Sequence, residues 1–196
     1  MFAYTVYEHR SYKEKQMQKK VSKELIIHGA TELIEEEGYG NLTIHALAYR
    51  LGVKPSTLYN HMKNIDDLKK AIRICALEKM QAEIAEETKG KSGKEALIAL
   101  ANAIRSFAKE NTELYKSIFN VTPNEGGIEL TSLLDTNIPD FNLTKDEAIH
   151  FTRAFCSAVF GFIMLETSGY FREYANTDNS FVTMVALLLS SLNSRS

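Results

Sequence analysis

The sequence contains no tryptophan, only two cysteines and three prolines, and no long apolar run. Cys75 and Cys156 lie far apart, so they form neither a disulfide scaffold nor a metal motif. No apolar stretch approaches the ~20 residues of a membrane span. A signal-peptide pattern is missing too, because Glu8, His9 and Arg10 precede any apolar stretch. We therefore expect buried free thiols in a cytoplasmic protein with no membrane contact.

Motifs for catalysis and metal binding are also missing. The five histidines are scattered without the spacing of metal ligands. Residues 90–94 resemble a phosphate-binding loop only in part. Thr88 stands where that loop needs a glycine, and Glu95 where it needs serine or threonine. No nucleophile elbow is present. We expect no enzyme activity, no catalytic residue, no metal and no cofactor.

Glycine and proline stand where apolar stripes of helical spacing end. One stripe over 25–34 is followed by Gly38, and another over 44–51 is followed by Gly52. Pro55 then opens a third helix at a first-turn position, where its missing N–H costs nothing. Asn64 is placed to cap a longer helix over about 66–88. Since no strand alternation persists, the predicted fold class is all-α.

Further helices are expected over the second part of the chain. They cover 94–110, a short segment near 114–119, roughly 128–136, a long apolar segment from a capping box at Thr144 to near Gly169, and Phe181 to Leu192 after a cap at Asp178 or Asn179. The first 70 residues carry eleven Lys and Arg against nine Asp and Glu, whereas the remainder has a net charge of −4. This asymmetry is compatible with nucleic acid binding at one end.

Residues 43–63 are the most informative stretch. They predict two short helices joined by a tight turn at Gly52, with Pro55 opening the second. This pattern is typical of a helix-turn-helix, which places one helix in the major groove of DNA. Polar donors and acceptors gather along the second helix. An ordinary helical hairpin with a polar face has the same spacing, so spacing alone leaves both interpretations open.

Residues 21–70 resemble the TetR family of bacterial transcriptional regulators. The matching positions are Gly38, Thr43, 46–48, 51–53, 58–64, Asp67 and Leu68. The resemblance implies a three-helix DNA-binding domain over 21–66 and a C-terminal helical bundle over 67–196 for ligand binding and dimerisation. Residues 1–20 form an N-terminal extension. It is a basic arm along the DNA backbone, a disordered tail, or an overlong predicted start with Met17 as the true initiator.

The resemblance also implies residue roles. Its DNA-binding positions are Thr43, Lys54, Ser56, Thr57, Tyr59, Asn60, His61 and Lys63. Thr57 and Asn60 would read base edges, whereas Tyr59 and His61 would hold the DNA backbone. The remaining four would contact phosphates, with Lys54 and Ser56 also able to reach bases. Ile65 stands where many members have lysine, so that phosphate contact passes to Lys63 or is absent.

Aromatic residues of the C-terminal bundle offer a place for a small, largely apolar ligand, with plain core packing as the alternative for each. The candidate pocket residues are Phe107, Tyr115, Phe119, Phe155, Phe160 and Met164. The polar groups that could orient such a ligand are Asn102, Arg105, His150, Arg153 and Glu166.

In the family, the last two helices form a four-helix dimer interface. Candidate interface residues are Phe162, Phe181, Met184, Val185 and Leu188. A two-fold dimer places two reading helices at half-sites about 34 Å apart. One subgroup has a histidine where this chain has Phe160, so no subgroup is assigned.

The sequence thus predicts a homodimeric repressor that leaves a palindromic double-stranded DNA operator when a small-molecule effector binds. An alternative is a DNA-binding regulator without such an effector, either an activator or a protein controlled by a partner protein. A third possibility is an all-α enzyme or carrier that has lost DNA binding.

Overall fold

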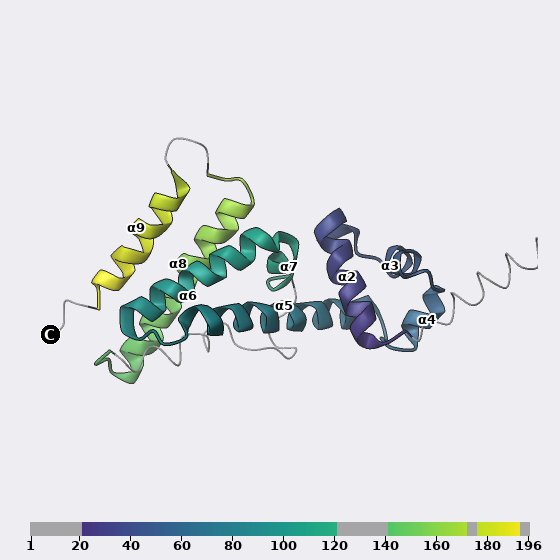
Figure 1. Ribbon diagram of the computed structural model, residues 1–196, viewed down its shortest axis with the longest axis horizontal. Helices are drawn as coiled ribbons and strands as arrows, with labels where there is room; N and C mark the ends of the chain where they lie inside the picture. The colour runs from purple at the N-terminus through teal and green to yellow at the C-terminus, as the bar shows by residue number, and fades with distance from the viewer. Residues whose placement is uncertain (1–20, 121–140, 172–175, 193–196) are drawn as a thin grey trace, which may run out of the picture. The chain divides into compact units, whose positions relative to one another are not determined.

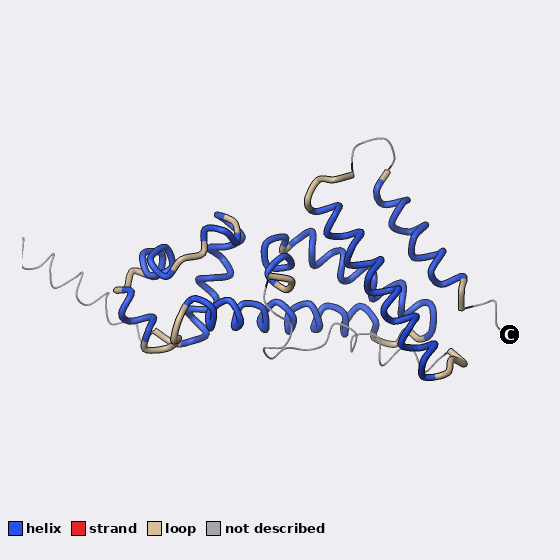
Figure 2. The backbone as a smooth tube through the Cα atoms, turned by 180° about the vertical axis from the view of Figure 1, so that it is seen from behind, coloured by secondary structure: helices blue, strands red, loops and turns tan. Residues whose placement is uncertain are grey.

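The computed structural model describes residues 21–120, 141–171 and 176–192, and within them every regular element is a helix (Figures 1 and 2). The all-α prediction is confirmed. The chain divides into two compact units, residues 1–72 and 73–196, and the division falls inside helix α5 (Ile65–Thr88). The predicted extension at 1–20 and helix near 128–136 lie outside the described residues. The predicted domain limits at 21–66 and 67–196 stay a prediction.

The first unit contains α2 (Lys23–Glu37), the 3-10 turn η1 (Tyr39–Asn41), α3 (Ile44–Leu51), α4 (Pro55–Tyr59) and the start of α5. Helix α2 packs on α3, and α3 packs on α4. Gly29 allows α2 to approach α3 closely, because a Cβ at this position would lie only 2.7 Å from Leu51 Cδ2 of α3. The buried core is Ile26, Ala30, Leu33, Ile34, Leu42, Ile44, Leu47, Ala48, Leu58, Met62, Leu68 and Ile72.

The ends of α3 follow the predicted signals. Thr43 Oγ1 accepts a hydrogen bond from the backbone N–H of Ala46 at 3.0 Å, which caps the first turn. Gly52 ends the helix in the left-handed conformation, with φ +67° and ψ +32°. Pro55 occupies the first turn of α4. The tight turn between two short helices is therefore confirmed.

The second unit contains the rest of α5 with α6 (Gly93–Glu110), α7 (Thr112–Ser117), α8 (Lys145–Thr167) and α9 (Thr177–Ser190). Helix α6 packs against α7, α8 and α9, and α8 packs against α9. The predicted inward face of α6 is fully buried: Leu97, Leu100, Ala101, Ile104, Phe107 and Ala108.

The capping box of α8 is confirmed. The backbone N–H of Thr144 donates to Glu147 Oε2 at 2.9 Å, and the Thr144 hydroxyl accepts from the Glu147 backbone. The cap predicted for α9 is wrong. Asn176 caps it instead, because its Oδ1 accepts from the backbone N–H groups of Asp178 and Asn179 at 2.8 and 3.3 Å. This leaves the Asp178 carboxylate directed at Arg105 of α6, 2.7 Å away.

Arg105 holds three helices of the second unit together. Its Nε donates to Glu166 Oε2 of α8 at 2.8 Å, and a second nitrogen bonds the other oxygen. Its guanidinium carbon lies 4.7 Å from the ring centre of Phe181 on α9. The hydrogen bond from Arg105 holds the pKa of Glu166 below its ordinary value. Paired charge and aromatic packing thus fasten α6, α8 and α9 at one place.

Two expectations are corrected. Cys75 and Cys156 are free but only half-buried, and burial raises the pKa of Cys156 to about 11, which disfavours its reactive thiolate.

By length and composition, α8 is long and apolar enough to cross a membrane, with a mean hydropathy of 1.6 over its most apolar window. The core helix of a soluble protein passes the same test. The expectation of no such run is therefore wrong for α8.

Replacing Gly52 by alanine tests the turn before α4. Gly52→Ala should lower the free energy of unfolding by about 1 kcal/mol, because a side chain disfavours the left-handed conformation. A Cβ meets no atom within 4 Å there, so the loss reports the backbone alone. Urea unfolding followed by circular dichroism measures it. Gly40→Ala is the matched control, since its φ is not positive and its surroundings are equally open. Equal effects of the two variants would contradict the assignment.

Replacing Glu166 tests the charge cluster. Glu166→Gln should cost about 2 kcal/mol at pH 7, because it removes the charge that Arg105 faces. The pKa of Glu166 is lowered on folding, so its contribution is present above the ordinary value of 4.5 and is lost as pH falls through the folded value. The gap between the two proteins in urea unfolding should therefore narrow as pH falls below 4.5 and close once pH passes the folded pKa. The control Glu86→Gln alters an exposed pair with Lys89 and should change little. A gap that stays the same from pH 7 to pH 3 would contradict this origin.

Candidate nucleic-acid interface and ligand-binding core

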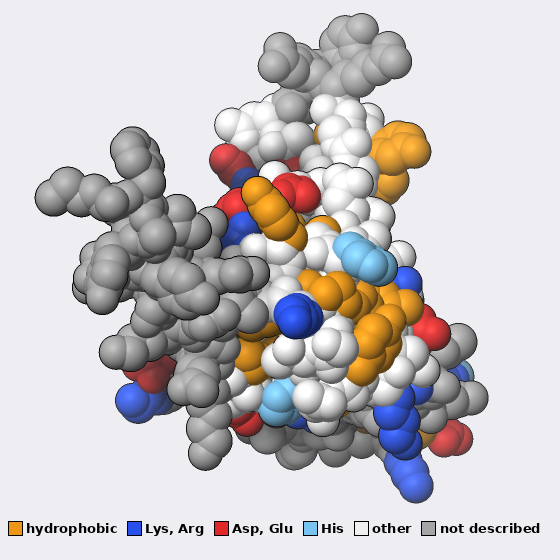
Figure 3. Space-filling view, turned by 90° about the vertical axis from the view of Figure 1, so that its right-hand side faces the viewer, with side chains coloured by type: hydrophobic (Ala, Val, Ile, Leu, Met, Phe, Trp, Pro, Cys, Tyr) orange, Lys and Arg blue, Asp and Glu red, His pale blue; other side chains and the backbone are white. Residues whose placement is uncertain are grey.

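Helix α4 presents polar side chains around two buried anchors. Leu58 is 1% exposed and Met62 is 5% exposed, so both belong to the core of the first unit. Most of the predicted DNA-contacting side chains around them are exposed: Thr43, Lys54, Ser56, Tyr59, Asn60, His61 and Lys63. Thr57 is half-buried. Figure 3, viewed from the side of α3 and α4, shows basic and histidine side chains beside hydrophobic ones.

The backbone after α4 is fixed by local hydrogen bonds. The N–H groups of His61 and Met62 both donate to the carbonyl of Leu58, at 2.9 and 3.1 Å. The N–H of Lys63 donates to Asp67 Oδ2 at 3.1 Å, and the N–H of Asp67 donates to Asn64 Oδ1 at 2.9 Å. Asn60 and His61 therefore follow the five-residue helix rather than lying within it, yet they are held in position.

Three positive charges of α3 and of the segments around α4 fall into two groups. Arg50 of α3 is bound to Glu36 at 2.6 Å and to Glu32 at 3.3 Å on α2, and its hydrogen bond lowers the pKa of Glu36. Within the described residues, Lys54 and Lys63 have no carboxylate partner, so they can pair with phosphates. Arg50 holds two helices together, whereas the two lysines face outward.

Sequence reasoning did not consider two exposed side chains of α3. Tyr49 is 91% exposed, and His45 is exposed one helical turn before it. Both lie on the side of this helix opposite the buried Leu47. Their spacing of four residues, out of phase with the apolar stripe, was the available signal.

Three of the six predicted pocket residues come together in the second unit. The Tyr115 ring lies 5.5 Å from Phe119 and 6.4 Å from Phe160, and the rings of Phe119 and Phe160 lie 5.7 Å apart. The Tyr115 hydroxyl donates to the Phe160 carbonyl at 3.4 Å, and burial raises the pKa of this tyrosine. We call Tyr115, Phe119 and Phe160 the aromatic cluster. Phe119 is 40% exposed, so the cluster is reachable from outside.

Among the described ring contacts, none joins the other predicted pocket residues to this cluster. Phe155 is buried and packs against Phe151, with ring centres 5.7 Å apart. Phe107 is fully buried in α6, and Met164 of α8 is half-buried. Core packing accounts for Phe107 and Phe155.

The structure reassigns the polar groups expected to orient a ligand. Arg105 and Glu166 satisfy each other, and Asn102, His150 and Arg153 are exposed. Arg73 of α5, which sequence reasoning missed, is buried, and its Nε donates to the Ile118 carbonyl at 2.9 Å. The available signal was a charged residue inside the apolar segment 71–77.

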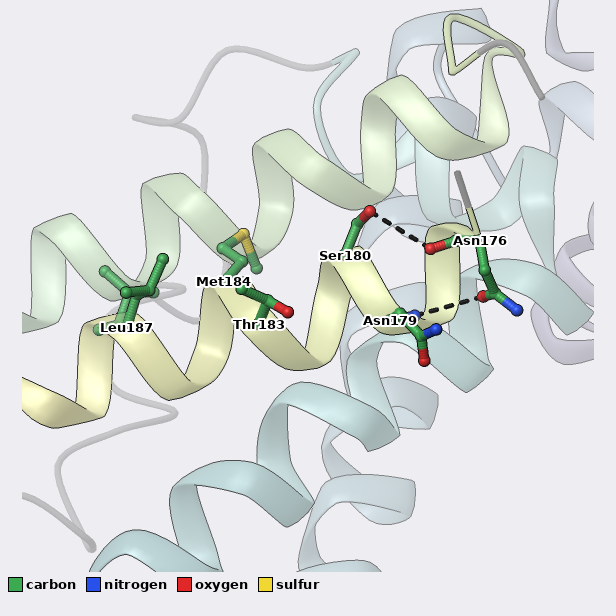
Figure 4. Close-up of a pocket in the computed structure, with 7 residues that line it drawn as sticks. Asn176, Asn179, Ser180, Thr183, Met184 and Leu187 are labelled. Atoms are coloured by element: carbon green, nitrogen blue, oxygen red, sulfur yellow. Dashed lines mark hydrogen bonds between the residues drawn. The ribbon is translucent and has the colours of Figure 1, made fainter. Parts of the chain in front are cut away.

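The predicted dimer residues divide into two sets. Phe181 and Val185 are 1% and 4% exposed within a single chain, so they pack in its core and offer no surface to a second copy, which corrects the expectation for these two. Phe162 is half-buried between Phe171 and Phe181. Met184 and Leu188, at the edge of this buried face of α9, line an open groove of about 620 Å³ (Figure 4). The remaining lining residues are Asn176, Asn179, Ser180, Thr183 and Leu187.

The described residues can be searched for groups of side chains that could hold a metal ion. Among them, no three His, Cys, Asp or Glu side chains gather to hold a metal ion. The polar chemistry of the described chain therefore lies at the exposed surface around α4 and at the buried arginines of the second unit.

Comparison with known proteins places this geometry in a family. Two family models match: Bacterial regulatory proteins, tetR family, over residues 26–72, and Tetracyclin repressor-like, C-terminal domain, over residues 97–188. The first match contains α4 and its anchors, and the second contains the aromatic cluster and most of α9.

Individual relatives agree with the models. The uncharacterized HTH-type transcriptional regulator Rv0681 of Mycobacterium tuberculosis is 29% identical over 183 residues, covering 90% of this chain and 84% of the relative. A variant of TetR from Acinetobacter baumannii AYE, crystallised with minocycline, superposes with a TM-score of 0.71 at 22% identity, covering 89% of this chain and 97% of that one. BioQ with its double-stranded DNA operator gives 0.69 at 20% identity, covering 90% and 100%. The chain belongs to the TetR family of helix-turn-helix, DNA-binding transcriptional regulators and is not an enzyme.

Proposed function

We propose that this regulator is a cytoplasmic homodimeric repressor that binds a palindromic operator and leaves it when a small, largely apolar effector binds the second unit. The observation that carries the DNA-binding part is the exposure of polar side chains around the buried anchors Leu58 and Met62. A surface so built can enter the major groove without disturbing the core.

The roles at the DNA follow from exposure and chemistry. Thr57 and Asn60 read base edges, because their side chains can donate and accept hydrogen bonds. Tyr59 and His61 hold the DNA backbone on either side. Phosphates are bound by Thr43, Lys54, Ser56 and Lys63, all of which are exposed. BioQ, a structural neighbour, has been crystallised with its double-stranded DNA operator.

Dimerisation uses the exposed apolar surface of the last two helices. Leu187 and Val182 of α9 are 67% and 63% exposed, and Leu165 of α8 is 43% exposed. Met184 and Leu188 add half-buried apolar surface in the groove of α9. A second copy that covers these side chains removes them from water, which favours association.

Release by an effector uses the continuity of α5. This helix supplies Leu68 and Ile72 to the core of the first unit and Leu77 and Met80 to the buried residues of the second. An effector that displaces its second part alters the spacing of the two reading helices. The operator must then weaken effector binding by the same factor, and a coupling of about 2–3 kcal/mol suffices for a switch. The minocycline complex of the Acinetobacter relative supports an effector of small-molecule size.

The double variant Tyr59→Ala and His61→Ala tests the interface. It should weaken operator binding at least 100-fold, because both clamps on the DNA backbone are lost, and it should leave the dimer intact. Fluorescence anisotropy with an operator fragment identified by footprinting upstream of the gene measures this. In cells, the variant should raise expression of a reporter placed behind that operator. The matched control, His150→Ala with Tyr170→Ala, removes an exposed histidine and a 74% exposed tyrosine from the second unit. Normal binding by the first variant would contradict the docking.

A charge on the groove side of α9 tests the dimer. Leu187→Glu should yield a monomer of 22.1 kDa in analytical ultracentrifugation, because the interface would bury a carboxylate. Operator affinity should fall with it, since a monomer binds only one half-site. Ile98→Glu, which places the same charge at a 45% exposed apolar position of α6, is the control and should remain dimeric. A dimeric Leu187→Glu variant would exclude this surface.

A further inference from the structure

The described residues contain two buried arginines in very different surroundings. Arg105 is 9% exposed and faces the carboxylates of Glu166 and Asp178. Arg73 of α5 is 7% exposed, and its one hydrogen bond runs from Nε to the carbonyl of Ile118 at 2.9 Å. Within the described part of the chain, no carboxylate pairs with Arg73.

A buried guanidinium with one neutral partner is unusual. A guanidinium group carries a positive charge and five N–H donors. Burying a charge without a counter-charge is costly, and for this reason buried arginines are normally paired. The Ile118 carbonyl accounts for a single donor at the end of α7. The remaining donors are suited to an anion supplied from outside the chain.

The carbonyl that accepts the hydrogen bond of Arg73 belongs to a segment with apolar and aromatic side chains. Ile118 stands between Tyr115 and Phe119 in the chain, and both of these belong to the aromatic cluster. All of these residues, with Phe160, lie in the second unit. A cation bonded to the segment that carries two of these rings, one of them 40% exposed, can receive a molecule with an anionic head and an apolar body.

We infer that Arg73 binds the carboxylate of an amphipathic, singly charged effector whose apolar part contacts the aromatic cluster. This inference rests on the proposed control by an effector and names the chemical class of that effector. A carboxylate matches the planar fork of the guanidinium with two oxygens. Its single negative charge balances the single buried cation, whereas a phosphate dianion leaves an excess charge. Since Arg73 lies on α5, its binding acts on the helix that continues from the first unit.

The test compares ligands that differ only in the head group. Decanoate and 2-naphthoate are titrated into the full-length protein by calorimetry, beside the alcohols and amines of the same carbon skeletons. Release of labelled operator by each compound is followed by anisotropy. At least one carboxylate should bind the wild-type protein 10-fold or more tightly than its alcohol and should release the operator.

Variants of Arg73 then assign the preference. Arg73→Met should abolish the difference between carboxylate and alcohol. Arg153→Met, which removes an exposed arginine of α8, should preserve it. Arg73→Lys keeps the charge but loses the planar fork, so the preference for carboxylate over alcohol should fall at least threefold. This variant tests the role of Arg73 if the methionine variant does not fold. Phe119→Ala should weaken carboxylate and alcohol alike, because it removes apolar contact only.

The outcomes separate the inference from the function on which it rests. If Arg73 served only to cap α7, its replacement would lower the melting temperature and leave the carboxylate preference unchanged, which overturns the inference. If alcohols or amines bind and release the operator as well as the carboxylates do, the inference fails while effector control stands. If no compound of either series binds, both fail.

Discussion

Burial of Leu58 and Met62 is the constraint on which the DNA-binding surface depends. A helix of five residues is not stable in water by itself, because too few backbone hydrogen bonds offset the cost of nucleation. Helix α4 therefore persists only because these two side chains are packed in the core of the first unit. The left-handed Gly52 before it and the Asn64–Asp67 hydrogen bonds after it fix both ends. The side chains from Lys54 to Lys63 that are assigned to the operator take their direction from this arrangement.

The two buried arginines described in the second unit have different partners. Arg105 is fully occupied by Glu166, Asp178 and an aromatic face, and so serves to join helices. Arg73 has a carbonyl and no paired carboxylate among the described residues. The same residue type thus stabilises the bundle at one position and, as we infer, binds a ligand at another. The difference lies entirely in what the neighbouring helices place beside it.

Exposure also changes the meaning of apolar residues on α9. Phe181 and Val185 point into the chain, whereas Leu187 and Val182 point out, although all four lie within seven consecutive residues. The sequence of a short, mainly apolar helix does not indicate which partner each of its apolar residues contacts. The helical period separates the faces but does not say which one meets α6 and α8 and which stays exposed.

The sequence by itself determined the helices, most of their ends and the family, because caps, glycines and apolar spacing act over a few residues. Thr43, Gly52, Pro55 and Thr144 took their expected places for this reason. Only the tertiary structure decided that Asn176 rather than Asp178 caps α9, that Arg105 and Glu166 neutralise each other across 61 positions, and that Arg73 is buried without a carboxylate. Those outcomes depend on which side chains meet between helices distant in the chain, and local spacing carries no information about such meetings.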